Sequence, residues 1–185
     1  MKKFLAALLI LFAFTANAQQ KPTDLDKSPA DISYCPANYP ILKMNGKVTD
    51  APIARVIYSR PQKAGRVIFG GIVAYNQVWR LGANEATEIE FFRNVKIGDK
   101  TVAKGRYTMY AICSETKWTI ILNSEKDIWG LSYNSKKDVL RIDEPVQQPD
   151  APVEAFTIYF EDAKNASTLN ILWDNVKVSL PISYL

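Results

Sequence analysis

The fold class is decided by the stretch Tyr107-Thr108-Met109-Tyr110-Ala111-Ile112-Cys113, in which residues 107, 109, 111 and 113 alternate with residues 108, 110 and 112. A period of two is that of a β-strand, whose successive side chains point to opposite faces, and not that of a helix. Turn residues at Lys104-Gly105 precede the stretch, and the run from Lys117 to Asn123 supplies the next strand.

The same alternation recurs on both sides of this pair. Further strands are predicted over residues 55–59, 87–95, 139–142, 154–160, 169–173 and 176–180, with turn residues between them. No long amphipathic helical window is found, although a short helix could hold Tyr75 to Leu81. Strands at this spacing predict an all-β domain, built as an antiparallel β-sandwich or a jelly-roll-like barrel.

The first residues have the layout of a secretory signal peptide. Lys2 and Lys3 precede an uncharged apolar run from Phe4 to Phe14, and Ala16-Asn17-Ala18 supplies the small-x-small site that a signal peptidase cleaves. The run is shorter than the ~20 residues that a membrane-spanning helix needs. We therefore expect residues 1–18 to be removed and the mature chain to be exported, periplasmic or secreted, with no membrane span.

The mature chain is predicted to contain a leader and one domain. Residues 19–31 are polar and contain Pro22 and Pro29, which indicates a flexible leader, and residues 32–185 are long enough for a single β-rich domain. The net charge of +4 falls to +2 without Lys2 and Lys3, and the remaining charges are interspersed along the chain. This pattern does not favour nucleic-acid binding.

Residues that commonly carry enzyme chemistry are scarce. The chain contains no histidine, which excludes Ser-His-Asp and Cys-His catalysis and the His-rich zinc, copper and non-haem iron sites. The sequence has no calcium-loop, phosphate-loop or dinucleotide motif, since Gly70-Gly71 is an isolated pair. We expect no metal site and no cofactor.

Cys35 and Cys113 are the only cysteines. They could pair as a disulfide in an oxidising compartment, or both could be small buried hydrophobic residues. The sequence leaves both alternatives open.

The loop Trp79-Arg80-Leu81-Gly82-Ala83-Asn84-Glu85-Ala86-Thr87 holds the most suggestive polar groups. It combines an aromatic ring, a guanidinium, an amide and a carboxylate, which suits the binding of a small polar ligand. Arg80, Asn84 and Glu85 would then make the polar contacts. The alternative is an internal ion pair between Arg80 and Glu85 that simply fastens the loop.

Residues elsewhere could complete such a site. Trp79 and Trp129 flank glycine-containing turns and could offer a flat wall to a sugar ring or another ligand, although large aromatic residues more often close the end of a core. Trp118 and Trp173 fall in strand patterns and are expected in the core. Further candidates, which would support the residues that touch the ligand, are Arg60, Asp138 and Arg141.

Several motifs, taken in order, resemble one bacterial protein family. They are Ser59-Arg60-Pro61, Gly65-Arg66-x-Ile68-Phe69-Gly70-Gly71, Val78-Trp79-Arg80-x-Gly82-Ala83-Asn84-Glu85-Ala86-Thr87, Lys104-Gly105-x-Tyr107, Trp118-Thr119-x-Ile121-x-Asn123, Trp129-Gly130 and Asp138-Val139-Leu140-Arg141. Over about residues 33–182 the chain resembles the domain-of-unknown-function family 2911. The resemblance implies an exported β-rich domain and brings no activity, substrate or catalytic residue with it.

Three hypotheses for the function stay open. The leading one is an extracytoplasmic binding module for a small polar ligand or glycan, and the lack of ordinary catalytic groups favours it over an enzyme. The second is a carboxylate-dependent hydrolase that uses Glu85 with another acidic residue such as Asp138, while Glu88 and Glu90 line the solvent face of a strand. The third is a structural or assembly partner in the envelope, which would show a large exposed apolar patch.

Overall fold

The computed structural model describes residues 24–185, so the predicted signal peptide and its cleavage site lie outside the described residues. The strands are β1 (Ala30–Cys35), β2 (Ala54–Ser59), β3 (Val78–Trp79), β4 (Glu88–Phe91), β5 (Val95–Ile97), β6 (Lys100–Val102), β7 (Gly105–Cys113), β8 (Lys117–Asn123), β9 (Asp138–Gln147), β10 (Val153–Ala163), β11 (Ala166–Asp174) and β12 (Val176–Tyr184). The helices are α2 (Tyr39–Met44) and the 3-10 helix η1 (Ser135–Lys137). The predicted all-β class is confirmed.

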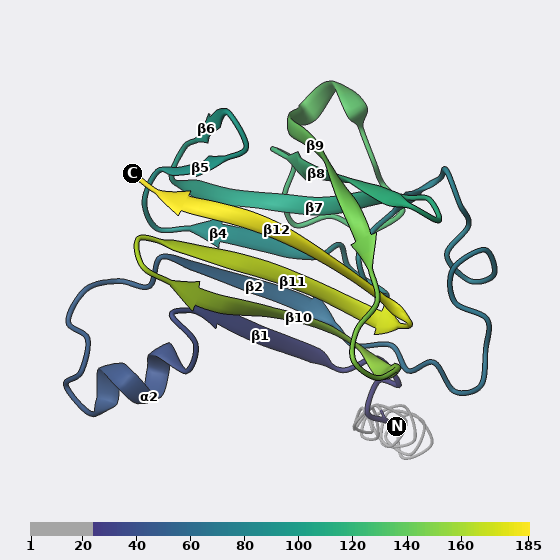
Figure 1. Ribbon diagram of the computed structural model, residues 1–185, viewed down its shortest axis with the longest axis horizontal. Helices are drawn as coiled ribbons and strands as arrows, with labels where there is room; N and C mark the ends of the chain where they lie inside the picture. Colours follow the sequence, from purple (N-terminus) through teal and green to yellow (C-terminus); the bar gives the residue numbers. More distant parts are fainter. Residues whose placement is uncertain (1–23) are drawn as a thin grey trace, which may run out of the picture.

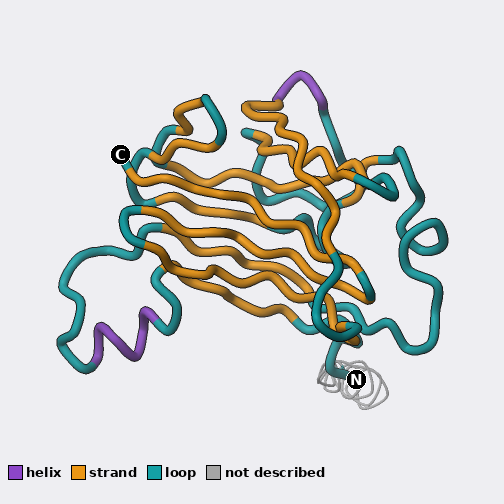
Figure 2. Tube along the Cα trace, in the orientation of Figure 1, coloured by secondary structure: helices purple, strands orange, loops and turns teal. Residues whose placement is uncertain are grey.

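The long strands form one antiparallel sheet that curves until its two edge strands lie side by side (Figures 1 and 2). The strand order is β1-β2-β4-β7-β8-β9-β12-β11-β10. β1 and β10 are in contact without a ladder between them, and a bridge between Gln62 and Ala155 closes part of the seam. The sheet is therefore nearly a closed barrel, which favours the barrel over the sandwich.

The alternation along each strand sorts side chains between the barrel interior and its outer face. On β7, Met109, Ala111 and Cys113 are fully buried in the main core. At one end of the barrel five aromatic rings pack edge to face or stacked, with neighbouring centroids between 5.1 and 6.5 Å apart. These rings are Phe69, Trp79, Trp118, Phe156 and Trp173, so Trp118 and Trp173 lie in the core as predicted.

A second, smaller core lies on the outer face of β7 and β8. Ala86, Tyr110 and Ile121 form it, and Ile128 and Tyr133 cover it. The two covering residues belong to the connection between β8 and β9, residues 124–137, which we call the β8–β9 cover (Figure 1, green, above the barrel). This segment thus buries part of the outer face of the barrel.

Two local predictions differ from the structure. The helix expected over Tyr75 to Leu81 is wrong, because Asn76 and Leu81 have positive φ angles of 59° and 53° and Val78–Trp79 pairs with β7 as strand β3. The α-helix lies instead at α2, where a proline occupies the first turn, as the fixed φ of proline allows. β1 begins at Ala30, two residues before the predicted start of the domain at residue 32.

The two cysteines are free, so the disulfide alternative between Cys35 and Cys113 is wrong. Cys35 ends β1 and Cys113 ends β7, and both β2 and β4 lie between these strands. The register aligns Cys35 with Ala54, Phe91 and Gly105 in turn, so Cys113 lies three strands away and eight residues farther along β7. At ~3.3 Å per residue along the strand, the two Cα atoms are far beyond the ~7 Å that a disulfide spans. Burial raises the pKa of both thiols, as expected of small hydrophobic core residues.

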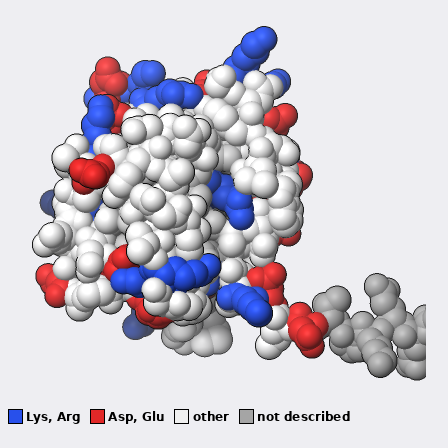
Figure 3. Space-filling model, turned by 90° about the vertical axis from the view of Figure 1, so that its right-hand side faces the viewer, with Lys and Arg blue, Asp and Glu red and all other residues white. Residues whose placement is uncertain are grey.

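The surface carries charges of both signs. On the side that Figure 3 presents, Lys and Arg side chains are interspersed with Asp and Glu side chains. In residues 24–185, no helix has the length and apolar character that crossing a membrane requires.

Candidate functional site

The loop of residues 79–87 pairs with the β8–β9 cover. The Ala86 N–H donates to the Ile128 carbonyl at 3.4 Å and the Gly130 N–H donates to the Asn84 carbonyl at 3.2 Å, which places Glu85 opposite Trp129. In such a pair the two facing residues do not bond to each other, and their side chains lie close together on one side. We call residues 84–86 and 128–130 the ribbon.

The ribbon has an inner and an outer side. Ala86 and Ile128 point inward onto Tyr110 in the smaller core. Glu85 and Trp129 point outward, and 52% of Trp129 is exposed. The ribbon therefore separates two surfaces with different chemistry.

Arg80 lies against the inner side of the ribbon. A Cβ atom on Gly130 would lie only 1.9 Å from Cδ of Arg80, so the stem of the arginine fits because residue 130 is glycine. Arg80 lines a pocket of about 360 Å³, the Arg80 pocket. Its other walls are mainly apolar and include Ile72, Val78, Trp79, Leu131 and Tyr133.

The guanidinium of Arg80 has no partner within residues 24–185, and its Nε is buried. The predicted internal ion pair with Glu85 is not formed among these residues. Every other arginine bonds to a carboxylate or a carbonyl oxygen, namely Arg55, Arg60, Arg66, Arg93, Arg106 and Arg141. Because a buried donor without an acceptor costs free energy, the Arg80 guanidinium is complementary to an anion.

Tyr133, one wall of the pocket, is held by the predicted candidates Asp138 and Arg141. Its hydroxyl donates to Oδ2 of Asp138 at 2.7 Å, and Arg141 donates to both the hydroxyl (2.6 Å) and Asp138 (2.8 Å). The ring packs on Tyr110 with centroids 4.9 Å apart. Burial raises the pKa of Tyr133 and raises that of Tyr110 to about 12, so both rings stay neutral at physiological pH. Asp138 and Arg141 thus support the wall of the pocket.

The remaining candidates on the barrel hold the fold together. Trp79 donates from Nε1 to the Gly82 carbonyl at 3.2 Å, and besides packing in the aromatic core it lines the Arg80 pocket. Arg60 donates to three acceptors on β1 and β10 and so ties the two edge strands together. Asn84 donates to Oδ2 of Asp26 at 3.0 Å. Of these three residues, only Trp79 reaches the pocket.

The two carboxylates of the hydrolase hypothesis do not share a cavity. Asp138 accepts hydrogen bonds from Asn123, Tyr133 and Arg141, whereas Glu85 is exposed on the outer side of the ribbon. An acid and a base that act on one bond must both reach it. The geometry therefore does not support Glu85 and Asp138 as a catalytic pair.

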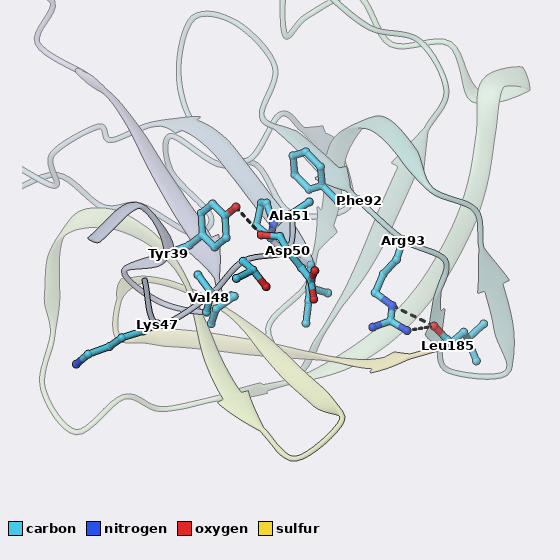
Figure 4. A pocket seen from close by; sticks show the side chains of 12 residues that line it. Tyr39, Lys47, Val48, Asp50, Ala51, Phe92, Arg93 and Leu185 are labelled. Atoms are coloured by element: carbon cyan, nitrogen blue, oxygen red, sulfur yellow. Dashed lines mark hydrogen bonds between the residues drawn. The ribbon is translucent and has the colours of Figure 1, made fainter. Parts of the chain in front are cut away.

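The largest cavity lies elsewhere, between the loop after α2 and the end of β12, with a volume of about 690 Å³ (Figure 4). Two of its polar side chains bond to backbone carbonyls. Tyr39 donates to the Asp50 carbonyl at 2.8 Å and Arg93 donates to the Leu185 carbonyl at 3.0 Å, while the Lys47 side chain points away. The Asp50 carboxylate and the Thr49 hydroxyl also line the cavity and form no hydrogen bond or ion pair within residues 24–185.

An apolar groove of about 520 Å³ runs beside β1 and β10. Ile32, Ile41 and Tyr159 line it and are 47%, 55% and 38% exposed. Nothing in the described residues shows what would cover the groove, so the assembly-partner hypothesis stays a prediction.

Sequence reasoning missed Gly130 and Tyr133 as parts of the site. Gly130 was visible only as half of the motif Trp129-Gly130, and its role depends on Arg80, which lies fifty positions earlier. The described part of the chain has no group of three or more His, Cys, Asp or Glu side chains that could hold a metal ion.

Comparison with known proteins gives one match. A family model described as "Protein of unknown function (DUF2911)" matches residues 40–182. Neither a curated protein nor a solved structure matches the chain.

Proposed function

The chain belongs to the DUF2911 family, and from its own geometry we propose that this member is an exported module that binds a small carboxylate in the Arg80 pocket. Export rests on the signal-peptide layout of residues 1–18. Binding of a carboxylate rests on one observation. Within residues 24–185 the guanidinium of Arg80 has no partner, and Arg80 lines a cavity of about 360 Å³. A guanidinium is the side chain best shaped for a carboxylate, because it donates two parallel hydrogen bonds.

The lining of the pocket narrows the ligand class. Arg80 is its only charged residue, and its other residues with polar side-chain groups are Gln77, Trp79 and Tyr133. One positive charge matches a single carboxylate better than a polyphosphate, and the apolar walls favour an acid with an apolar body. The volume is that of a site for a small metabolite.

The test compares Arg80→Gln with a matched change at an exposed arginine, Arg66→Gln, by calorimetric titration. The ligands are benzoate, 3-phenylpropionate and hexanoate, with their neutral amides and inorganic phosphate as comparisons. We expect the carboxylates to bind, the amides not to bind, and Arg80→Gln to weaken binding about 10- to 100-fold, the size expected for charge-assisted hydrogen bonds. Arg66→Gln should bind like the unmodified protein.

Two outcomes would overturn the proposal. One is equal binding of acids and amides, which would make the pocket merely apolar. The other is unchanged affinity in Arg80→Gln, which would place the anion elsewhere. Stronger binding of phosphate than of any carboxylate would keep the anion site and reject the carboxylate class.

A further inference from the structure

A second cavity, of about 460 Å³, opens beside the ribbon. Its apolar walls come from Ile57, Ala86, Ile128 and Trp129, and its polar groups are the carboxylates of Glu85, Glu88 and Asp127. Trp129 is 52% exposed and Ile57 is 38% exposed, so an aromatic ring and an aliphatic side chain face solvent beside negative charge. The Arg80 pocket, on the inner side, shares none of these residues.

We propose that this cavity, the Glu85–Trp129 site, binds an organic ammonium group. The face of an indole attracts a cation, and it does so most strongly where a carboxylate supplies the opposite charge nearby. The ribbon provides this arrangement, because Glu85 and Trp129 are directly opposed in the closely spaced type of antiparallel pair. The Ser132 N–H donates to the Trp129 carbonyl at 2.8 Å and fixes the backbone on the far side of the ring.

Three carboxylates and one guanidinium surround the cavity, so its net charge is negative and matches a cationic ligand. Arg106 lies 3.4 Å from Glu88 and pairs with Asp127, so one guanidinium serves two of the three carboxylates. Glu85 forms neither an ion pair nor a side-chain hydrogen bond within residues 24–185, as judged from the contacts of that part of the chain. One carboxylate beside an aromatic ring is therefore left to attract a cation.

An organic cation fits this cavity better than a metal ion. The carboxylates do not converge as ligands, since no metal-binding group of acidic side chains is found in the described chain. A hard metal ion needs several converging oxygen atoms, whereas a methylated or primary ammonium gains from apolar and aromatic walls. The site is thus independent of the carboxylate proposed for the inner side of the ribbon.

The test is an NMR titration of the ¹⁵N-labelled protein with choline chloride. The control ligand is 3,3-dimethylbutan-1-ol, which has the same shape with carbon in place of the charged nitrogen, and sodium chloride controls for ionic strength. We expect choline to shift the indole Nε1–H signal of Trp129 saturably, and we expect the alcohol and the salt not to do so. Nα-acetyl-lysine amide tests the other source of the same chemistry, a lysine side chain.

Variants separate this site from a surface effect. We expect Trp129→Leu to weaken choline binding at least about tenfold and Glu85→Gln about three- to tenfold, in line with the strength of cation–π and charge pairs. Glu115→Gln removes an exposed carboxylate elsewhere, so it should not change the affinity. The dispersion of each spectrum shows whether the variant is folded.

Three results would overturn the inference. They are equal shifts with the neutral alcohol, unchanged choline affinity in both Trp129→Leu and Glu85→Gln, and an equal loss of affinity in Glu115→Gln. Failure of carboxylate binding would leave choline binding untouched, because the two titrations report on different residues. Preference for choline or for the lysine derivative assigns the ammonium to a free quaternary amine or to a peptide.

Discussion

Arg80 and Gly130 occupy adjoining space that admits only one large side chain. The Cδ atom of Arg80 lies where a Cβ of residue 130 would stand, so the missing side chain of the glycine sets the direction of the guanidinium. Neither Arg80 nor Gly130, considered alone, indicates this packing. Packing against Gly130 fixes the aliphatic part of the Arg80 side chain. Its guanidinium has no partner within residues 24–185.

At this scale we predict that Gly130→Ala displaces the Arg80 side chain. The clash should cost about 1–3 kcal/mol of unfolding free energy, as overpacking does, and should weaken carboxylate binding to the level of Arg80→Gln. Urea unfolding and the calorimetric titration measure the two effects. In an Arg80→Ala background, which removes Cδ and Cγ and leaves only Cβ at 2.8 Å, Gly130→Ala should cost less. An equal loss of unfolding free energy in both backgrounds would contradict the packing of Arg80 against Gly130.

The β8–β9 cover is the element that creates both proposed sites. Its residues form one strand of the ribbon, a wall of the Arg80 pocket and the lid of the smaller core. Asn123, which is 1% exposed at the end of β8, fixes the cover at its root. Its side chain donates to the Asn134 carbonyl (2.9 Å) and Asp138 (2.8 Å) and accepts from the Glu125 N–H (3.0 Å).

We therefore predict that Asn123→Ala loosens the whole cover. Losing three hydrogen bonds at a buried position should reduce the unfolding free energy by about 2–4 kcal/mol. Amide hydrogen exchange should speed up in residues 124–137 more than in the barrel strands. The matched control is Asn175→Ala in the exposed turn between β11 and β12, which should change stability by less than about 0.5 kcal/mol. Uniformly faster exchange would contradict a local role.

At the scale of the whole molecule, the strand order determines which distant residues meet. Arg60 joins the two edges of the sheet, and the order β1-β2-β4-β7 keeps Cys35 and Cys113 apart. Cys35 instead contacts the Tyr184 hydroxyl at 3.2 Å and Asp162 at 3.4 Å. The barrel thus uses both cysteines as buried packing residues.

This topology predicts that both thiols are free and protected. Without any reductant, the unfolded protein should take up N-ethylmaleimide at both cysteines, whereas the folded protein should react slowly, because burial raises both thiol pKa values. Mass spectrometry distinguishes the two states. A protein that becomes alkylated only after reduction would contradict the strand order.

The alternation along the chain by itself determined the all-β class and most of the strands, including β7 and β8. It could do so because a period of two is a local pattern. The residues of each strand are enough to indicate which of its faces is buried. The loop of residues 79–87 was likewise marked by its residue types. Local pattern failed at Tyr75 to Leu81, where pairing with β7 and left-handed backbone at Leu81 override a helical interpretation.

Only the tertiary structure decided how the marked residues are used. Among residues 24–185 it gave Arg60, Asp138 and Arg141 partners and left Arg80 without one, and it set Glu85 beside Trp129 across a gap of more than forty residues. Such pairings depend on strand order and on where the β8–β9 cover rests, which no local period encodes. The sequence determined which chemical groups are available, and the closing of the barrel decided which of them are left for a ligand.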